Sequence, residues 1–221
     1  MTQKVCAIVG AGPGLGLALA RGFGALGHSI ALLARRPEAL AELKKPLEAE
    51  GITAAGFLCD AGRVDSIRAS LAKVAEDLGP PTLLIYNASI YREGLPSEVE
   101  PEKLAEDLAL DVVGAAAAVQ AVLPRMRSAR GGTILLTGSG VALHPWAPAY
   151  TLSVGKAALR SFALCLAEEL KESEIHAATI TIDGVIQPSG PFSPEHIAKA
   201  FVAVYQQAKP EWQGELRYQG D

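Results

Sequence analysis

The sequence predicts an α/β fold, with one parallel sheet of seven strands and helices on both of its faces. The first observation is that short β-branched or leucine-rich runs alternate with longer segments of helical period. The second is composition, because 49% hydrophobic and 20% charged residues are typical of a globular chain and exclude a disordered one. The third is length, because an α/β chain of 221 residues commonly forms one domain, so we expect residues 1–221 to fold as a single unit.

The expected elements follow one another as βαβ units do. The strands are short apolar runs, expected at 4–9, 29–34, 53–58, 82–86, 133–137, 175–182 and 215–218. The helices have apolar residues at helical spacing and are expected at 15–26, 37–50, 64–78, 101–128, 149–171 and 194–207. The segment 183–193 contains two glycines and two prolines, and it is short enough to be a loop rather than a linker between domains.

Neither the charge nor the cysteines point to nucleic acid, a membrane or a metal. The net charge is −4, and no run of Lys or Arg exceeds two residues. Cys6, Cys59 and Cys165 are isolated, which argues against a disulfide framework and against a zinc site. The apolar run at 5–9 is too short for a signal peptide, and no stretch of about 18 apolar residues occurs. We therefore expect a cytoplasmic protein.

A glycine-rich turn between the first strand and the first helix has the pattern of an anion site. Gly10, Gly12, Gly14 and Gly16 surround the start of the helix at Leu15. Glycine lets the backbone approach a phosphate, while the free N–H groups and the dipole of the helix favour negative charge. The spacing GxxxGxG differs from the GxGxxG of the commonest dinucleotide fold, so the turn alone is a weak signal.

Several motifs occur in the order of one known family. The family reads TGxxxGxG in the glycine turn, which matches here except that Val9 replaces threonine. The later matches are Tyr-Asn-Ala-Ser at 86–89 for NNAG, Gly-Gly-Thr-Ile at 131–134 before a strand, and Ser153 with Lys156 from YSASKAAL. On these residues the chain resembles the short-chain dehydrogenase/reductase family, from residue 4 to about 218. The resemblance implies a Rossmann fold and a nicotinamide cofactor, with Leu15, Asn87 and Lys156 among its contacts.

The end of the second strand predicts NADP rather than NAD. A dinucleotide fold reads the 2′ position of the adenosine ribose there, and Ala34 stands where an NAD-type relative carries Asp. Arg35 can form a charge-assisted contact with a 2′-phosphate, although Arg35 and Arg36 also fit a solvated loop face. The resemblance implies that Asp60 contacts the adenine amino group, and a cap of the next helix is its alternative role.

The expected catalytic site departs from the family pattern. The family uses a Tyr as acid/base, a Ser that polarises the carbonyl oxygen, a Lys four residues after the Tyr, and an Asn in a water relay. Ser139 and Lys156 match, whereas Leu152 stands at the Tyr position and Asp111 at the Asn position. Because leucine cannot donate a proton, we expect carbonyl reduction to be slowed by about 10²–10⁴-fold.

Three groups are candidates to replace the missing acid. Tyr150 is one, although it lies about 120° from Lys156 around a helix and would have to swing back into the site. The others are a water held by Ser139 and Lys156, and His144. Asp111 could join a proton relay, but we expect it to form a structural ion pair with Lys156.

The segment after the sixth strand is short. The family has Pro-Gly there and then a lid of some tens of residues, whereas this chain has Asp183-Gly184 and reaches Pro194 ten residues later. The nicotinamide end should therefore be open to water.

We expect an NADP-dependent oxidoreductase that acts on an unknown carbonyl or alcohol. The alternatives are a non-catalytic NADP-binding protein, such as a redox sensor or a partner subunit, and a flavodoxin-like nucleotide binder. The helices at 101–128 and 149–171 have apolar residues on more than one face, and relatives pair these helices across a two-fold axis. We therefore expect a homodimer or a homotetramer.

Overall fold

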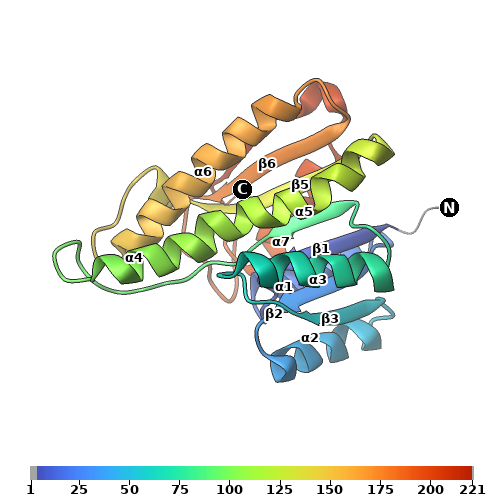
Figure 1. Ribbon diagram of the computed structural model, residues 1–221, viewed down its shortest axis with the longest axis horizontal. Helices are drawn as coiled ribbons and strands as arrows, with labels where there is room; N and C mark the ends of the chain where they lie inside the picture. The colour runs from blue at the N-terminus through green and yellow to red at the C-terminus, as the bar shows by residue number, and fades with distance from the viewer. Residues whose placement is uncertain (1–3, 221) are drawn as a thin grey trace.

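The computed structural model describes residues 4–220 and contains one sheet of seven parallel strands (Figure 1). The strand order across the sheet is β3-β2-β1-β4-β5-β6-β7. The strands are β1 (Val5–Val9), β2 (Ser29–Ala34), β3 (Ala54–Leu58), β4 (Leu83–Tyr86), β5 (Gly132–Ser139), β6 (Ile175–Ile182) and β7 (Glu215–Tyr218). The α/β class and the seven-stranded parallel sheet predicted from the sequence are confirmed.

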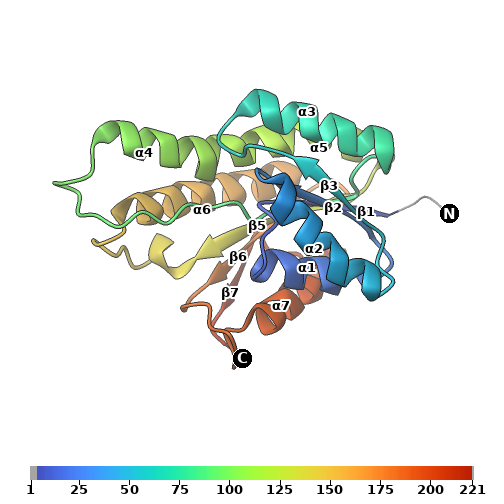
Figure 2. The ribbon, with the colours of Figure 1, turned by 90° about the horizontal axis from the view of Figure 1, so that it is seen from below.

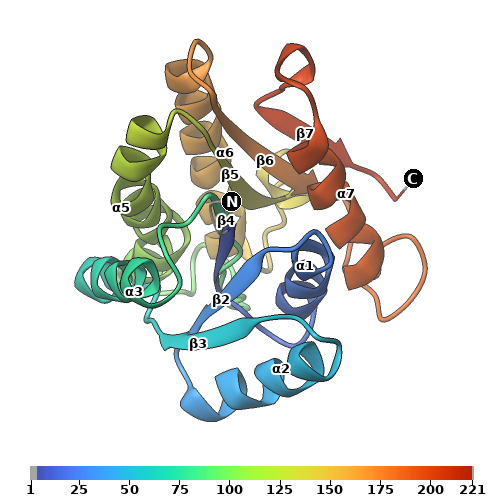
Figure 3. The same cartoon turned by 90° about the vertical axis from the view of Figure 1, so that its right-hand side faces the viewer.

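Helices cover both faces of the sheet, as Figures 2 and 3 show. The helices are α1 (Leu15–Gly24), α2 (Pro37–Ala49), α3 (Val64–Asp77), α4 (Pro101–Leu108), α5 (Gly114–Ala129), α6 (Tyr150–Leu170) and α7 (Pro194–Gln206). On one face α1 lies between α2 and α7, and on the other α3, α5 and α6 lie side by side. Each face has its own hydrophobic core, so the sheet is buried on both sides.

The strand β1 shows why the apolar runs are continuous rather than alternating. Successive side chains of a strand point to opposite faces. Val5, Ala7 and Val9 accordingly belong to the core under α3, α5 and α6, while Cys6 and Ile8 belong to the core under α1, α2 and α7. All five are completely buried. A strand in this position needs apolar residues at every step, as is usual in a parallel sheet covered on both faces.

The order of the strands reverses next to β1, and this point positions the site. The chain passes from β1 outward to β2 and β3, then returns to place β4 on the other side of β1. The loops after β1 and β4 therefore leave the carboxyl edge of the sheet in different directions, and a crevice opens between them. The backbone N–H of Asn87 donates to the carbonyl of Val9 (2.8 Å), which joins the two strand ends below this crevice.

The helix expected at 101–128 is interrupted by a π turn at Ala109–Val113, between α4 and α5. Such turns leave backbone groups without their usual helical partners and occur often at functional sites. Here the hydroxyl of Tyr86 donates to the carbonyl of Leu110. Burial raises the pKa of Tyr86, so the hydroxyl stays protonated and keeps this role. Gly114 makes the contact possible, because a Cβ at that position would clash with the Tyr86 hydroxyl and the Ala61 carbonyl.

One helical stretch has the length and composition of a membrane span. It comprises Pro101–Ala129, with a mean hydropathy of 1.5 over its most apolar window. Half of that window is buried within the protein, against the sheet and the neighbouring helices.

The Tyr86 hydroxyl gives a test of the π turn. Tyr86→Phe leaves the buried Leu110 carbonyl without its donor and should lower the free energy of unfolding by about 1–3 kcal/mol. The matched control is Tyr91→Phe, because Tyr91 is 59% exposed and its change should stay within about 0.5 kcal/mol. Thermal unfolding of both variants measures the difference, and equal melting temperatures would contradict this role of Tyr86.

Candidate active site

Two cavities adjoin at the carboxyl edge of the sheet. The first, which we call the glycine-loop cavity, has a volume of about 360 Å³ and lies beside the residues 10–13 and 33–36. The second, which we call the Lys156 cavity, has a volume of about 320 Å³ and lies beyond the ends of β5 and β6. Asn87 and Ser89, at the end of β4, line both cavities. Together they form a path along the crevice where the strand order reverses.

The glycines of the turn after β1 have two different roles. Gly10 has a φ of +85°, and a Cβ there would clash with the backbone of Ala88, so only glycine allows the loops after β1 and β4 to meet. A Cβ on Gly16 would lie 3.0 Å from the Cα of Ala11, so this glycine lets α1 pack against the turn. Gly12 and Gly14 instead face open space, with no atom within 4 Å of such a Cβ.

The start of α1 fits a phosphate. Gly14 is the N-cap and has no side chain to accept a hydrogen bond from the first turn, which begins at Leu15. The N–H groups of this turn and the positive end of the helix dipole can therefore serve a bound anion. The open space beside Gly12 and Gly14 leaves room for it. The residues of the predicted phosphate site thus fit the pyrophosphate of a dinucleotide.

Arg35 lines the glycine-loop cavity, whereas Asp60 does not. Arg35 is exposed and lines the glycine-loop cavity together with Ala34 and Arg36, so a cation and no carboxylate stand at the end of β2. The carboxylate of Asp60 accepts a hydrogen bond from the Gly62 N–H (3.0 Å), within the turn that precedes α3. The residues on either side of Asp60 line the cavity, but Asp60 does not. One oxygen of the carboxylate thus closes this turn, and the expected adenine contact stays a prediction.

Asn87 connects the two cavities. Its side-chain amide donates to the carbonyl of Gly10 (2.9 Å), and its side-chain oxygen accepts from the Thr137 hydroxyl (3.0 Å). The glycine turn, the end of β4 and the end of β5 are thereby fixed to one another. The predicted cofactor residue Asn87 lies in the groove, and part of its function is to hold the groove's shape.

Lys156 lies in the second cavity and is only 4% exposed. Its ammonium donates to the backbone carbonyl of Thr137 at 2.8 Å. Burial lowers the pKa of Lys156, and the nearby charge of Asp111 opposes this shift. Ser139, at the end of β5, and Leu152, one helical turn before Lys156, line the same cavity. The predicted group of Ser139, Leu152 and Lys156 is therefore brought together, with an apolar side chain where the family has its acid.

Asp111 is buried in the π turn and does not form the expected ion pair. Within residues 4–220, no ion pair joins it to Lys156, whose ammonium is taken up by Thr137. The carboxylate packs against Gly155, where a Cβ would clash with it. The Ser89 hydroxyl and the Ile90 backbone N–H interact with this carboxylate and lower its pKa, but neither forms a hydrogen bond of standard geometry, so they offset only part of the cost of burial. Burial consequently raises the pKa of Asp111, although the charge of Lys156 acts in the opposite direction.

Two of the suggested replacement acids lie outside the Lys156 cavity. The hydroxyl of Tyr150, the first residue of α6, points to the carbonyl of Val99 at 3.5 Å. His144 is exposed in the loop before α6. Neither side chain lines the cavity, so the expectation that Tyr150 acts there is not met by this structure. The reason is the position of Tyr150 on the helix, which directs it to the loop before α4 rather than toward Lys156.

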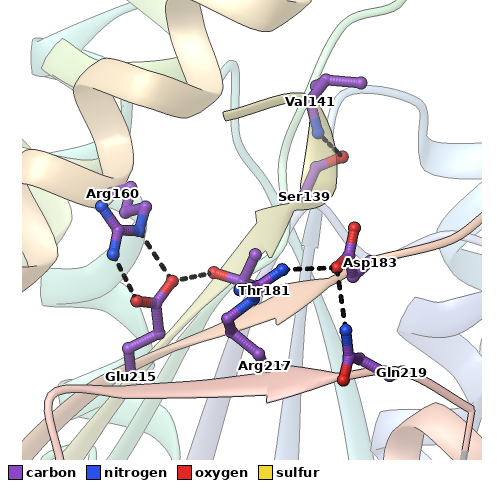
Figure 4. Close-up of polar contacts among 8 residues, drawn as sticks. All are labelled: Ser139, Val141, Arg160, Thr181, Asp183, Glu215, Arg217 and Gln219. Carbon is purple, nitrogen blue, oxygen red and sulfur yellow. Dashed lines mark hydrogen bonds and ion pairs between the residues drawn. The ribbon is translucent and has the colours of Figure 1, made fainter. Parts of the chain in front are cut away.

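The loop after β6 is anchored to the edge strand, as Figure 4 shows. Asp183 accepts hydrogen bonds from Arg217 (2.7 Å) and Gln219 (3.3 Å). Arg160 of α6 donates a hydrogen bond to each carboxylate oxygen of the neighbouring Glu215 on β7. Only the loop 183–193 connects β6 to α7, so no helical lid covers the Lys156 cavity from this side in the described chain. The short connection expected from the sequence is present.

Sequence reasoning missed the residues that support the site from behind. Thr137 provides a backbone carbonyl to Lys156 and a hydroxyl to Asn87, and a backbone contact leaves no signal in the residue type. Arg92 donates two hydrogen bonds, of 2.9 and 2.8 Å, to the buried carboxylate of Asp107, and this bidentate ion pair fixes the loop between β4 and α4. An Arg and an Asp fifteen residues apart give no recognisable pattern before the loop is folded.

Comparison with known proteins gives consistent matches. A family model described as short chain dehydrogenase matches residues 4–188. The chain is 30% identical over 178 residues to 2,3-dihydro-2,3-dihydroxybenzoate dehydrogenase of Bacillus subtilis, covering 80% of this chain and 68% of that protein. It is 28% identical over 182 residues to the 3-oxoacyl-acyl-carrier-protein reductase FabG of Pseudomonas aeruginosa, covering 82% and 72%.

Solved structures match over almost the whole chain. A metagenomic short-chain oxidoreductase in complex with NADP has a TM-score of 0.88 and 25% identity, covering 99% of this chain and 100% of that one. L-sorbose reductase from Gluconobacter frateurii, complexed with NADPH and L-sorbose, has a TM-score of 0.89 and 25% identity, covering 98% and 94%.

Asp111 predicts an unusual dependence of stability on pH. Because burial raises its pKa, the unfolded carboxyl ionises first, and folding is opposed once the pH rises above the ordinary value of 3.8. Asp111→Asn removes this penalty, so its melting temperature at pH 7 should exceed that of the wild type. The advantage should shrink as the pH falls toward 4. A variant that is less stable than the wild type at pH 7 would show that the contacts of the carboxylate outweigh the cost of its burial, contrary to this prediction.

Asp107 is the matched control, because it is as buried as Asp111 but forms a bidentate ion pair with Arg92. Asp107→Asn breaks a buried ion pair and should lower the free energy of unfolding by about 3–5 kcal/mol at pH 7. The two substitutions remove the same charge from the same helical region and should change the melting temperature in opposite directions.

Proposed function

The chain belongs to the short-chain dehydrogenase family, and from this premise we propose that it is an NADP-dependent oxidoreductase acting on a carbonyl or alcohol. The observation that carries the proposal is the Lys156 cavity, where Ser139 and Lys156 face one space that adjoins the glycine-loop cavity. A nicotinamide cofactor supplies or accepts a hydride, which the side chains of this site cannot do. The residues around it need only bind, orient and move a proton.

The preference for NADP rests on the end of β2. Arg35 and Arg36 line the glycine-loop cavity beside Ala34, so a 2′-phosphate meets positive charge and no carboxylate repels it. The NADP and NADPH complexes of the structural neighbours agree with this preference. Arg35 adjoins the strand end directly, and we assign the main contact to it.

Ser139 and Lys156 have distinct roles in the proposed reaction. Ser139 donates a hydrogen bond to the substrate oxygen, where charge changes during the reaction. Lys156 has three N–H donors, of which one is used by Thr137, so the others can serve ribose hydroxyls or a water. The water takes the place of the absent tyrosine, held between Ser139 and Lys156. Asp111 is too deeply buried to reach the substrate and acts only through its charge on Lys156.

A second function has support from Leu152. An apolar side chain fills the position of the acid, and the Lys156 cavity has no lid over it. Both features suit a protein that binds NADP without turnover, such as a redox sensor or a partner subunit. The two functions share the cofactor site and differ in whether a substrate is converted.

The cofactor preference can be measured by calorimetry. The wild type should bind NADP(H) more tightly than NAD(H), and Arg35→Ala should weaken NADP(H) binding by about 10–150-fold, or roughly 1.5–3 kcal/mol. Arg21→Ala is a control, since this exposed Arg pairs with Glu50 away from the cavity. Equal affinities of the wild type for both cofactors would contradict the assignment of the 2′-phosphate contact to Arg35.

A screen of carbonyls and alcohols with NADPH and NADP⁺, run on the wild type and on Leu152→Tyr, separates the two functions. Under the oxidoreductase proposal the wild type is active and the tyrosine raises its rate by about 10²–10⁴-fold. A silent wild type beside an active variant would establish the non-catalytic alternative. Lys156→Met should weaken NADP binding by about 1–3 kcal/mol in either case.

We also propose that the protein works in the cytoplasm as a homodimer or homotetramer. Val113 and Val154, on the π turn and on α6, are exposed apolar side chains of the helices expected to pair. Light scattering at micromolar concentration should give a mass of two or four chains. A mass of 23.0 kDa, that of one chain, would contradict the proposal.

A further inference from the structure

The mouth of the Lys156 cavity is apolar. Within residues 4–220, four of the eight large hydrophobic side chains that are exposed lie there or next to it, namely Tyr91, Trp146, Val185 and Ile186. Tyr91 and Ile186 line the cavity itself, and Val185 adjoins Ile186. These residues come from three loops far apart in the sequence, so their meeting is a product of the fold. An apolar surface left open to water at a cavity mouth is typical of a binding site.

Two aromatic rings stack on each other at this mouth. The rings of Tyr91 and Trp146 are stacked, with their centroids 6.5 Å apart and an angle of 26° between their planes. Trp146 is 49% exposed and Tyr91 is 59% exposed, so neither ring is consumed by the protein core. We call this pair the aromatic shelf. The exposed face of either ring is a surface on which another ring can pack.

The loops that carry the aromatic shelf are tied to neighbouring elements. The hydroxyl of Ser153 accepts from the backbone N–H of Trp146 at 3.0 Å, which ties the loop before α6 to the helix. The N–H of Gly94 donates to the carbonyl of Pro148 (2.8 Å) and joins this loop to the one before α4. The fork between Arg92 and Asp107 fixes the segment next to Tyr91. The backbone that carries the two rings is therefore fixed before any ligand arrives, which lowers the entropic cost of binding.

The inner part of the cavity has few polar groups to spare. The side chain of Asn87 already contacts Gly10 and Thr137, and the Thr137 hydroxyl is used in the same contact. Lys156 has one donor engaged by Thr137. The remaining donors of Lys156 serve the cofactor ribose or a water in the proposed function, and the Ser89 hydroxyl interacts with Asp111. The large side chains left for a substrate are apolar, including Ile90, Leu152 and Ile182. A polyhydroxylated substrate would lose water from many hydroxyls and find few partners, which is a strong penalty.

The charge of the side chains that line the cavity restricts the class of ligand further. Lys156 is the one charged side chain among the residues that line this cavity in the described chain, and it lies at the inner end beside Ser139. A phosphate or carboxylate at the mouth would find no cation there. The ligand that matches has one polar oxygen at its inner end and an uncharged apolar body at its outer end.

We propose that the Lys156 cavity takes a neutral, planar, apolar carbonyl compound, whose ring system lies on the Tyr91–Trp146 shelf and whose oxygen faces Ser139. This inference rests on the proposed oxidoreductase function and names the substrate class of that site. Leu152 contributes to it directly, because it makes the wall apolar at the position where a tyrosine would present a hydroxyl. The open mouth allows the ring system to extend out of the cavity.

The test measures binding separately from turnover. Equilibrium dialysis with the protein saturated by NADP⁺ uses 2-acetylnaphthalene as the aromatic ketone and L-sorbose as the polar ketone, and the oxidised cofactor prevents reduction during the measurement. The aromatic ketone should bind saturably and at least tenfold more tightly than L-sorbose. Equal or tighter binding of L-sorbose would overturn the proposal, and so would the absence of saturable binding of the aromatic ketone.

Variants locate the binding. Trp146→Ala and Ile186→Ala should each weaken binding of the aromatic ketone by about 3–10-fold, since each removes part of the apolar mouth. Leu58→Ala is the control, because Leu58 is an exposed apolar residue of the edge strand β3 that does not line the cavity. An unchanged affinity in Trp146→Ala would remove the shelf from the proposal and overturn it.

The affinity for NADP⁺, measured by calorimetry on the same variants, should not change. Loss of ketone binding with intact NADP⁺ binding contradicts only the substrate class. Absent NADP⁺ binding in the wild type contradicts the proposed function itself, so the two failures are distinguishable.

Discussion

The close approach of the loops after β1 and β4 is the constraint on which the site depends. Gly10 allows this approach, because any Cβ there would meet the backbone of Ala88, and Asn87 secures it through Gly10 and Thr137. Three strand ends are thereby held in one arrangement at the point where the strand order reverses. The glycine-loop cavity lies on one side of this junction and the Lys156 cavity on the other, so both halves of the groove share a single support.

The second feature of the site is a pair of buried ionisable side chains, Lys156 and Asp111, which influence each other's pKa without forming an ion pair. Lys156 directs its ammonium to Thr137, while Asp111 lies in the π turn beside the Ser89 hydroxyl and the Ile90 backbone N–H. Burial acts on the two groups in opposite directions, raising the pKa of Asp111 and lowering that of Lys156, so it disfavours the charged form of each. The turn that carries Asp111 is itself fixed by the hydrogen bond of the Tyr86 hydroxyl to Leu110 and by the close packing at Gly114.

The loops at the mouth of the Lys156 cavity have little regular secondary structure, but hydrogen bonds and ion pairs hold them to neighbouring elements. The fork of Arg92 on Asp107, the Gly94 contact to Pro148 and the anchoring of Asp183 by Arg217 each bind a loop to a neighbouring element. In place of a mobile lid, the Lys156 cavity has a fixed and largely apolar rim. Such a rim selects ligands by shape and polarity rather than by closing over them.

The sequence alone determined the α/β class, the seven strands, the glycine turn and the alignment of Ser139, Leu152 and Lys156, because each rests on local periodicity or on a motif of neighbouring residues. It could not determine which side chains satisfy one another across the fold. The π turn within the expected helix 101–128 depends on Tyr86, and the Lys156 contact depends on a carbonyl of β5. Likewise, the direction of Tyr150 away from the cavity and the meeting of Tyr91 with Trp146 follow from how separate loops pack. Tertiary structure decided these points because a buried polar group takes whichever partner the packing brings within reach, and residue type does not encode that distance.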